Sequence, residues 1–146
     1  MSHLSMTRSE REAFLAGLHV GILAVEGGDG RPPLTAPIWY GYEPGGDVFF
    51  VIGRTSQKAR RLTAAGRASV CAQSEDAPYK YVTVEGPVAI TDGVEPEQRR
   101  ALAHRYLPAA LADGYIAATA DTEADTVTVH LTPRRWLTTD YAKQFG

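Results

Sequence analysis

The chain has 146 residues, a formal net charge of −2, and 44% hydrophobic and 22% charged residues. This length and composition predict one compact globular domain spanning residues 1–146. No apolar run approaches the roughly 20 residues of a membrane span, and the weakly acidic balance argues against a protein that binds nucleic acid through bulk charge. The single cysteine, Cys71, excludes an intrachain disulfide framework. We therefore expect a cytoplasmic protein with neither a membrane nor a nucleic-acid partner.

The first third of the sequence predicts one short helix and then three strands. Thr7–Glu10, TRSE, is a capping-box pattern that starts a helix ending near Gly17. The runs 19–26 and 34–43 are rich in β-forming residues, and a turn of Gly, Asp and Pro separates them. The run 47–53, DVFFVIG, is apolar on both faces, which predicts a strand in the centre of the sheet.

The middle of the sequence predicts a helix followed by two strands. Thr55 is expected to cap the helix, and Gly66 suits the position just beyond its end. Strands are predicted at 68–73 and 79–92. The second is unusually long, and its Gly86-Pro87 pair predicts a bulge or a bend.

The last part of the sequence predicts one more helical region and a final strand. Pro96 suits the first position of a helix that Pro108 kinks or breaks, and 114–125 is predicted to be a loop. Alternating valines predict a strand at 126–133. The sequence therefore predicts a mainly β fold: a six-stranded antiparallel β-barrel with two to three short helices in its connections. A parallel sheet is not expected, because too few connections contain a crossover helix.

The densest run of cations, GRTSQKARRL at residues 53–62, contains no acid. On a helix, Arg54, Lys58 and Arg61 share one side. Thr55 and Ser56 add hydroxyl groups, and the first amides of a helix have no intrahelical acceptor. Amides, hydroxyls and cations together favour a phosphate site, whereas the simpler alternative is a basic face exposed to solvent.

A second candidate stretch is TAPIWYGYE, residues 35–43. Pro37 within a strand indicates a sheet edge or a bulge, where neighbouring backbone groups are free to bond a planar heterocycle. Trp39 and Tyr40 would then supply aromatic walls, although this stretch taken alone favours the alternative, that both are core or interface residues. No metal or catalytic constellation accompanies these stretches, because the four histidines are scattered without ligand spacing.

The ordered set of strand, turn, strand, S-x-K-x-R-x-L and VTVEG resembles the split β-barrel flavin-binding superfamily typified by pyridoxamine 5′-phosphate oxidase. Within it, residues 14–141 are most similar to the group B flavin/deazaflavin oxidoreductases of actinobacteria. The resemblance implies a split barrel and a homodimer with two cofactor sites at the subunit interface. The implied cofactor-binding residues are Pro37, Ile38, Trp39, Val51, Ile52, Gly53, Arg54, Thr55, Ser56, Lys58, Arg61 and, from the partner chain, Tyr79, Lys80, Tyr81 and Trp136.

The resemblance implies an oxidoreductase that transfers a hydride between coenzyme F420 and a small conjugated organic substrate, with no catalytic side chain of its own. F420 is favoured over FMN because its acidic tail suits the run of cations. The alternatives are an FMN-binding protein similar to pyridoxamine 5′-phosphate oxidase, a haem-binding relative and a cofactor-binding protein without turnover. Vitamin B6 oxidase activity is not expected, because the tail PRRWLTTDYAKQFG does not match the substrate-gripping tail of those oxidases.

Overall fold

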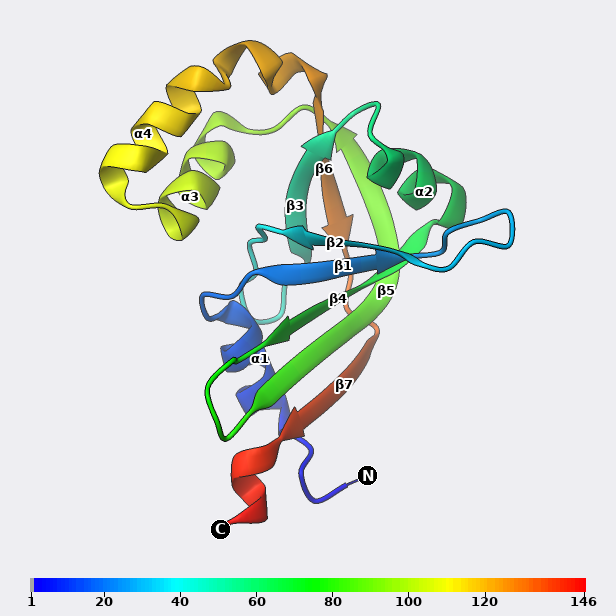
Figure 1. Ribbon diagram of the computed structural model, residues 1–146, viewed down its shortest axis with the longest axis vertical. Coiled ribbons are helices and arrows are strands. Elements are labelled where there is room, and N and C mark those ends of the chain that lie inside the picture. The colour runs from blue at the N-terminus through cyan, green and yellow to red at the C-terminus, as the bar shows by residue number, and fades with distance from the viewer. Residues whose placement is uncertain (1) are drawn as a thin grey trace.

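The computed structural model describes residues 2–146, and its centre is a strongly curled antiparallel sheet (Figure 1). Six strands follow one hydrogen-bonded path, β2-β1-β4-β5-β6-β3, and β7 pairs with β5 beside that path. The strands are β1 Gly21–Val25, β2 Leu34–Ile38, β3 Val48–Gly53, β4 Arg67–Gln73, β5 Lys80–Asp92, β6 Thr126–Leu131 and β7 Arg135–Asp140. The helices are α1 Arg8–Ala16, α2 Gln57–Ala65, α3 Pro96–Tyr106, α4 Ala109–Ala118 and the short 3-10 helices η1 Ala120–Asp125 and η2 Tyr141–Gln144.

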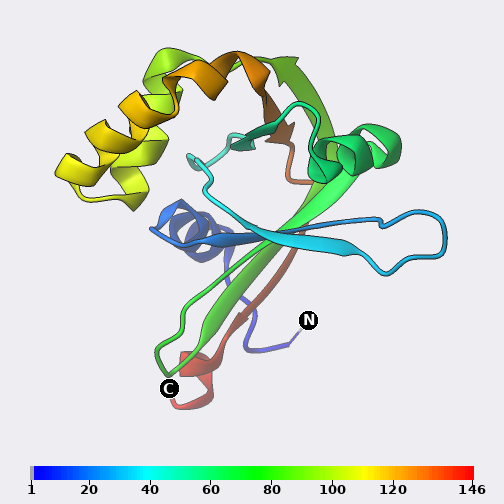
Figure 2. The same ribbon diagram turned by 45° about the horizontal axis from the view of Figure 1, so that its top comes forward.

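The longest strand, β5, joins the two halves of the barrel (Figure 2). Its first half pairs with β4 and β7, and its second half, from Val88 to Asp92, pairs with β6. Between the two halves, a Cβ added at Gly86 would lie 1.8 Å from the carbonyl oxygen of Thr132. This close approach of two backbones is the physical reason for glycine at the predicted bend.

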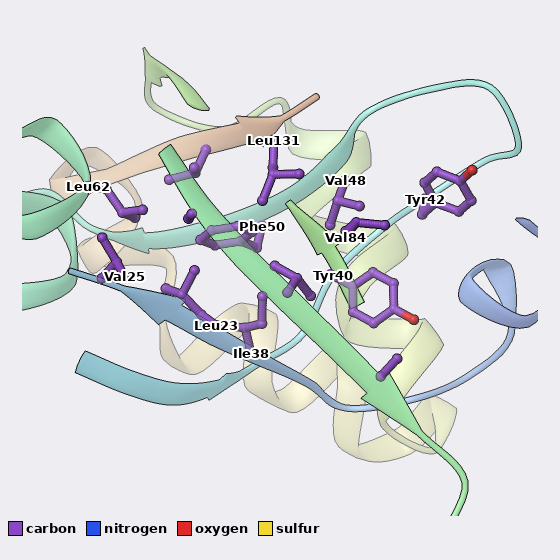
Figure 3. Close-up of a cluster of buried hydrophobic side chains, with 14 of the residues drawn as sticks. Leu23, Val25, Ile38, Tyr40, Tyr42, Val48, Phe50, Leu62, Val84 and Leu131 are labelled. Atoms are coloured by element: carbon purple, nitrogen blue, oxygen red, sulfur yellow. The ribbon is translucent and has the colours of Figure 1, made fainter. Parts of the chain in front are cut away.

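The core lies inside the curled sheet (Figure 3), where every second side chain of β1, β3 and β4 is buried. In β5, Val82 and Val84 are fully buried, while Tyr81 and Thr83 between them are half-buried. Helix α2 covers one end of the barrel and inserts the fully buried Leu62. The period-two burial confirms the alternation predicted for the strand at 79–92.

The ends of α1 and α2 confirm two predicted caps and move a third by one residue. In α1 the Thr7 hydroxyl accepts from the Glu10 amide at 3.2 Å, and the Glu10 carboxylate accepts from the Thr7 amide at 2.7 Å, so the predicted capping box is confirmed. In α2 the cap is Ser56 rather than Thr55, because the helix begins at Gln57. Gly66 ends α2 in the left-handed conformation, with φ 72°, as predicted.

The connection between β5 and β6, residues 93–125, is named here the helical insertion; it contains α3, α4 and η1. Figure 1 shows its two antiparallel helices lying outside the barrel at one end of the molecule. The predicted loop at 114–125 is therefore wrong, since α4 continues to Ala118 and η1 follows it. The alanine-rich sequence of α4 has a high helix propensity, and Gly114 lowers it by only about 1 kcal/mol.

The predicted mainly β split barrel with six antiparallel strands is confirmed, and β7 adds a seventh strand on β5. The last predicted helical region is divided at Pro108 into α3 and α4. The predicted central position of β3 is wrong, because β3 ends the hydrogen-bonded path and pairs only with β6 among the strands. Its second apolar face has another cause: Phe49 packs against Gly41, and Val51 lines a cavity.

Candidate cofactor-binding site

A cavity of about 440 Å³ lies between β2 and β3, the two strands that end the hydrogen-bonded path. Residues 37–39 line it from the β2 side, and residues 51–53 line it from β3. Because each of these strands has a pairing strand on one side only, the backbone groups of the other edge are available to a ligand. The gap between them is closed at one end by a two-hydrogen-bond bridge between Gly41 and Phe49.

The opposite wall of the cavity comes from the helical insertion and is partly aromatic. The ring of Trp39 stacks on that of Tyr106 in α3, with centroids 5.2 Å apart and planes at 5°, and lies 5.5 Å from Tyr115 in α4. The Tyr106 hydroxyl donates to the His19 carbonyl at 2.7 Å and accepts from the Tyr40 amide at 3.1 Å. These contacts attach the insertion to the end of β2 and close the cavity on that side.

Tyr40 does not form the aromatic wall that the sequence predicted for it. Its side chain is fully buried in the core, and its hydroxyl donates to the Leu15 carbonyl at 2.7 Å. Burial strongly raises the pKa of this hydroxyl. Consecutive side chains of an extended chain point to opposite faces, so of Trp39 and Tyr40 only Trp39 reaches the cavity.

Three arginines in or just after the 53–62 run have partners that are distant in the sequence. Arg54 donates to the Asp92 carboxylate, and Arg61 donates to the backbone carbonyl of Glu26 at 3.0 Å. Arg67 forms an ion pair with the Glu26 carboxylate at 2.7 Å. The 53–62 run contains no acid, but in the folded chain its long arginine side chains reach acids and carbonyls of other segments.

Lys58 differs from these arginines, because within residues 2–146 its ammonium group makes no hydrogen bond and no ion pair. It is half-buried and lines the cavity from the first turn of α2. The amides of Gln57 and Lys58 belong to the same turn, where no intrahelical acceptor exists. The Ser56 hydroxyl is already engaged, since it donates to the Gly53 carbonyl at 2.7 Å and accepts from the Ala59 amide at 3.1 Å. The structure thus leaves one free cation and one helix N-terminus beside the cavity.

The structure brings only part of the predicted set together. The cavity is lined by Pro37, Ile38, Trp39, Val51, Ile52, Gly53 and Lys58. Predicted residues that do not line it are Arg54, Thr55, Ser56, Arg61, Tyr79, Lys80, Tyr81 and Trp136. The last four lie on β7 or at the start of β5, at the end of the barrel away from the helical insertion (Figure 1). Trp136 points toward the core, where its ring meets Tyr42 edge-on and the Arg11 guanidinium lies 4.6 Å from its centroid.

Sequence reasoning missed the contribution of the helical insertion to the cavity. Arg99, Leu102 and Tyr115 line it from this segment. Arg99 also links the two helices, because it donates to the Ile116 carbonyl at 3.1 Å and to the Thr119 hydroxyl. The only local signal was the pair of tyrosines in an otherwise polar and alanine-rich stretch, and that pattern does not show which surface the helices cover.

A family model for pyridoxamine 5′-phosphate oxidase matches residues 7–140. The chain belongs to this family. Among curated proteins, none matches the sequence.

Several solved structures share the fold of this chain. A conserved hypothetical protein from Mycobacterium tuberculosis is 24% identical, with a TM-score of 0.78 over 100% of this chain and 92% of that one. An F420 reductase is 25% identical, with a TM-score of 0.69 over 86% of this chain and 94% of that one. A FAD-binding protein from Mesorhizobium loti is 18% identical, with a TM-score of 0.62 over 92% of this chain and 94% of that one, and shares the fold.

The cavity fits a flavin-type group of this superfamily. Its volume lies within the ordinary range of ligand pockets, and it combines apolar walls with a few convergent polar groups. The free strand edges suit a planar heterocycle, and Lys58 with the α2 amides suits a phosphate. Among residues 2–146 there is no cluster of three metal-ligating side chains, and no helix is long and apolar enough to cross a bilayer.

Proposed function

We propose that the chain is an oxidoreductase that binds coenzyme F420 in this cavity and acts on a small conjugated organic substrate. The observation that carries the proposal is the cavity itself, in which two free sheet edges, the Trp39 ring and the unpaired Lys58 converge. Bound there, F420 supplies the hydride transfer. FMN, which offers a similar ring system and a phosphate, is the alternative cofactor.

The residues of the chain have binding and orienting roles in this proposal. Lys58 and the first amides of α2 hold the phosphate group, and the edges of β2 and β3 orient the ring. The helical insertion covers the site with Leu102 and Tyr115 and so excludes water from it. No side chain is assigned a covalent or acid-base step.

The 25% identical F420 reductase favours F420 over FMN. The abundance of cations argues for F420 less strongly than the sequence suggested, because Arg54, Arg61 and Arg67 have partners within the chain. A single phosphate, as in FMN, needs no more than Lys58 and the helix terminus. Direct titration therefore has to decide between the two cofactors.

The test is titration of the purified protein with F420 and with FMN, followed by cofactor fluorescence. Replacing Lys58 by Ala should weaken binding about 10- to 100-fold, the loss of one charge-assisted hydrogen bond. Arg60→Ala is the matched control, because Arg60 lies in the same turn and, among residues 2–146, its side chain donates only to the Thr55 carbonyl at 2.7 Å. Equal affinities of Lys58→Ala and the parent would remove Lys58 from the site.

A second assay separates an enzyme from a binding protein without turnover. Reduced F420 or FMN is mixed with the protein and a panel of enones, quinones and tetrapyrroles, and cofactor oxidation is recorded. The proposal expects oxidation that depends on both protein and acceptor. Tight cofactor binding with no oxidation by any acceptor would favour the non-catalytic alternative.

We also propose that the protein is a homodimer in which the outer face of the sheet is covered by a second copy. Strand register aligns Pro37, Ile22, Cys71, Thr83 and Leu137 in one row across β2, β1, β4, β5 and β7. Ile22 and Leu137 are 42% and 37% exposed. A row of this kind, apolar at every position but Thr83, is typical of an interaction surface.

The proposed dimer places the open side of the cavity at the subunit interface, because Pro37 belongs both to the row and to the cavity lining. Tyr79, Lys80 and Tyr81 would then approach the partner's cavity. Light scattering should show a dimer that Ile22→Glu converts to a monomer. Leu111→Glu, at a 61% exposed position on α4 outside the row, should leave the dimer intact. A monomeric parent protein would refute the proposal.

A further inference from the structure

The helical insertion leaves and rejoins the barrel at two adjacent points, and Arg54 forms hydrogen bonds at both of them. The insertion begins after Asp92, the last residue of β5, and ends before Thr126, the first residue of β6. The Arg54 guanidinium donates to the Asp92 carboxylate on one side and to the Ala124 carbonyl at 2.9 Å on the other. The Arg54 amide donates to the Asp125 carbonyl at 2.7 Å.

These contacts give a role to Arg54, which the proposed phosphate site does not use. Arg54 does not line the cavity, although it immediately follows Gly53, which does. The guanidinium partners lie where the insertion meets the barrel: the Asp92 carboxylate just before it, and the carbonyls of Ala124, within it, and Thr126, just after it. The insertion in turn supplies Arg99, Leu102 and Tyr115 to the cavity wall. A change at Arg54 therefore acts on the cavity through the position of α3 and α4.

We propose that Arg54 is a positioning residue that holds the helical insertion over the cavity and thereby sets the affinity for a ring-bearing ligand. The part that concerns the ligand rests on the proposed function, whereas the part that concerns the helices does not. At the other end, the insertion is held by the Trp39–Tyr106 stack and by the Tyr106 hydroxyl. Loss of the Arg54 side chain should loosen the end of the insertion that joins the barrel, where the backbone hydrogen bonds from Gly93 to Thr126 and from Arg54 to Asp125 remain. The end at Tyr106 should stay attached.

Two readouts report on the insertion without any cofactor. The chain has two tryptophans, and in a Trp136→Phe background Trp39, which stacks on Tyr106, is the only one left. Its fluorescence quenching by acrylamide measures how well α3 covers it. Hydrogen exchange of the α3 and α4 amides, compared with those of β4 and β5, measures opening of the insertion against opening of the barrel.

Arg54→Ala should raise exchange of the α3 and α4 amides about tenfold or more, raise Trp39 quenching, and leave the amides of β4 and β5 as in the parent. Asp92→Asn, which keeps the arginine but removes the ion pair, should change both readouts in the same direction. Arg54→Lys should restore part of the protection. Arg60→Ala is the matched control, because among residues 2–146 the only hydrogen bond of the Arg60 side chain, to the Thr55 carbonyl, does not involve the insertion.

Ligand affinity completes the test, with FMN and F420 as probes. Arg54→Ala and Asp92→Asn should both weaken binding, in proportion to the increase in exchange. Hydrogen exchange and Trp39 quenching in Arg54→Ala that equal those of the parent would overturn the proposal. Weaker ligand binding in Arg54→Ala with unchanged binding in Asp92→Asn would also overturn it, because that pattern indicates that Arg54 contacts the ligand directly. If the parent binds neither probe, the proposed function fails, while exchange and quenching still decide the role of Arg54.

Discussion

Replacing Tyr106 by Phe should destabilise the protein while leaving the aromatic stack on Trp39 in place. The hydroxyl removed donates to the His19 carbonyl at 2.7 Å and accepts from the Tyr40 amide at 3.1 Å. Tyr40 is fully buried, so its amide would lose its partner without gaining a water molecule. His19 is half-buried, and its carbonyl can be solvated after the change.

The expected loss is about 2 kcal/mol, the desolvation cost of one buried, unsatisfied backbone amide. For a chain of this length that corresponds to a decrease in Tm of about 4–8 °C. Urea unfolding followed by circular dichroism gives the free energy of unfolding directly. Because the stacked ring is retained, the Trp39 emission maximum of the folded protein, recorded in a Trp136→Phe background, should not move.

Tyr115→Phe is the matched control, since Tyr115 also faces Trp39 but is 44% exposed and its hydroxyl makes no hydrogen bond within residues 2–146. This control should unfold within about 0.5 kcal/mol of the parent, as surface changes usually do. Equal free energies of unfolding for Tyr106→Phe and Tyr115→Phe would refute the assignment of a structural role to the Tyr106 hydroxyl.

Two further predictions concern the barrel and its N-terminal helix. Gly86→Ala should lower the free energy of unfolding in urea by several kcal/mol, because the new Cβ would lie 1.8 Å from the Thr132 carbonyl oxygen. Gly114→Ala is the control: its Cβ would meet nothing within 4 Å, and the change should stabilise α4. Equal effects of the two changes on the free energy of unfolding would contradict this prediction. The Lys143 ammonium and the Thr7 amide lower the pKa of Glu10 from 4.5 to about 2, so its contribution to stability is complete above pH 4.5 and is lost as the pH falls toward 2. Lys143→Met should therefore reduce the loss of stability over that pH range, measured by thermal unfolding; an unchanged pH profile would exclude this pair as its cause.

Much of the fold was predictable because it depends on local patterns. The capping box at Thr7, the left-handed Gly66 and the alternation of Val82 and Val84 each follow from interactions within a few residues or from one buried face. The position of β3 was not predictable in this way. Phe49 and Val51 make its second face apolar for reasons that lie in Gly41 and in the cavity, not in a second neighbouring strand.

Part of the candidate site was likewise predictable from the sequence, and part was not. Residues 37–39 were predictable in part because a proline in a strand indicates an edge, whereas residues 51–53 were implied by the family resemblance, and both sets line the cavity. The helical insertion was not, because nothing in an alanine-rich helix states which distant surface it covers. Whether Tyr79, Lys80 and Tyr81 reach a partner's cavity stays a prediction.

The mainly β class, most of the strands and helix caps, and the run of cations at the start of α2 follow from local sequence patterns. What those cations do depends on the folded chain, because arginine and lysine side chains reach partners that chain order does not reveal. Arg54 and Arg61 meet Asp92 and the carbonyl of Glu26, which lie far away in the sequence but adjacent in space. Lys58 meets no such partner among residues 2–146, and it faces the cavity. Folding thus separates one cation available to a ligand from neighbours that hold the structure together.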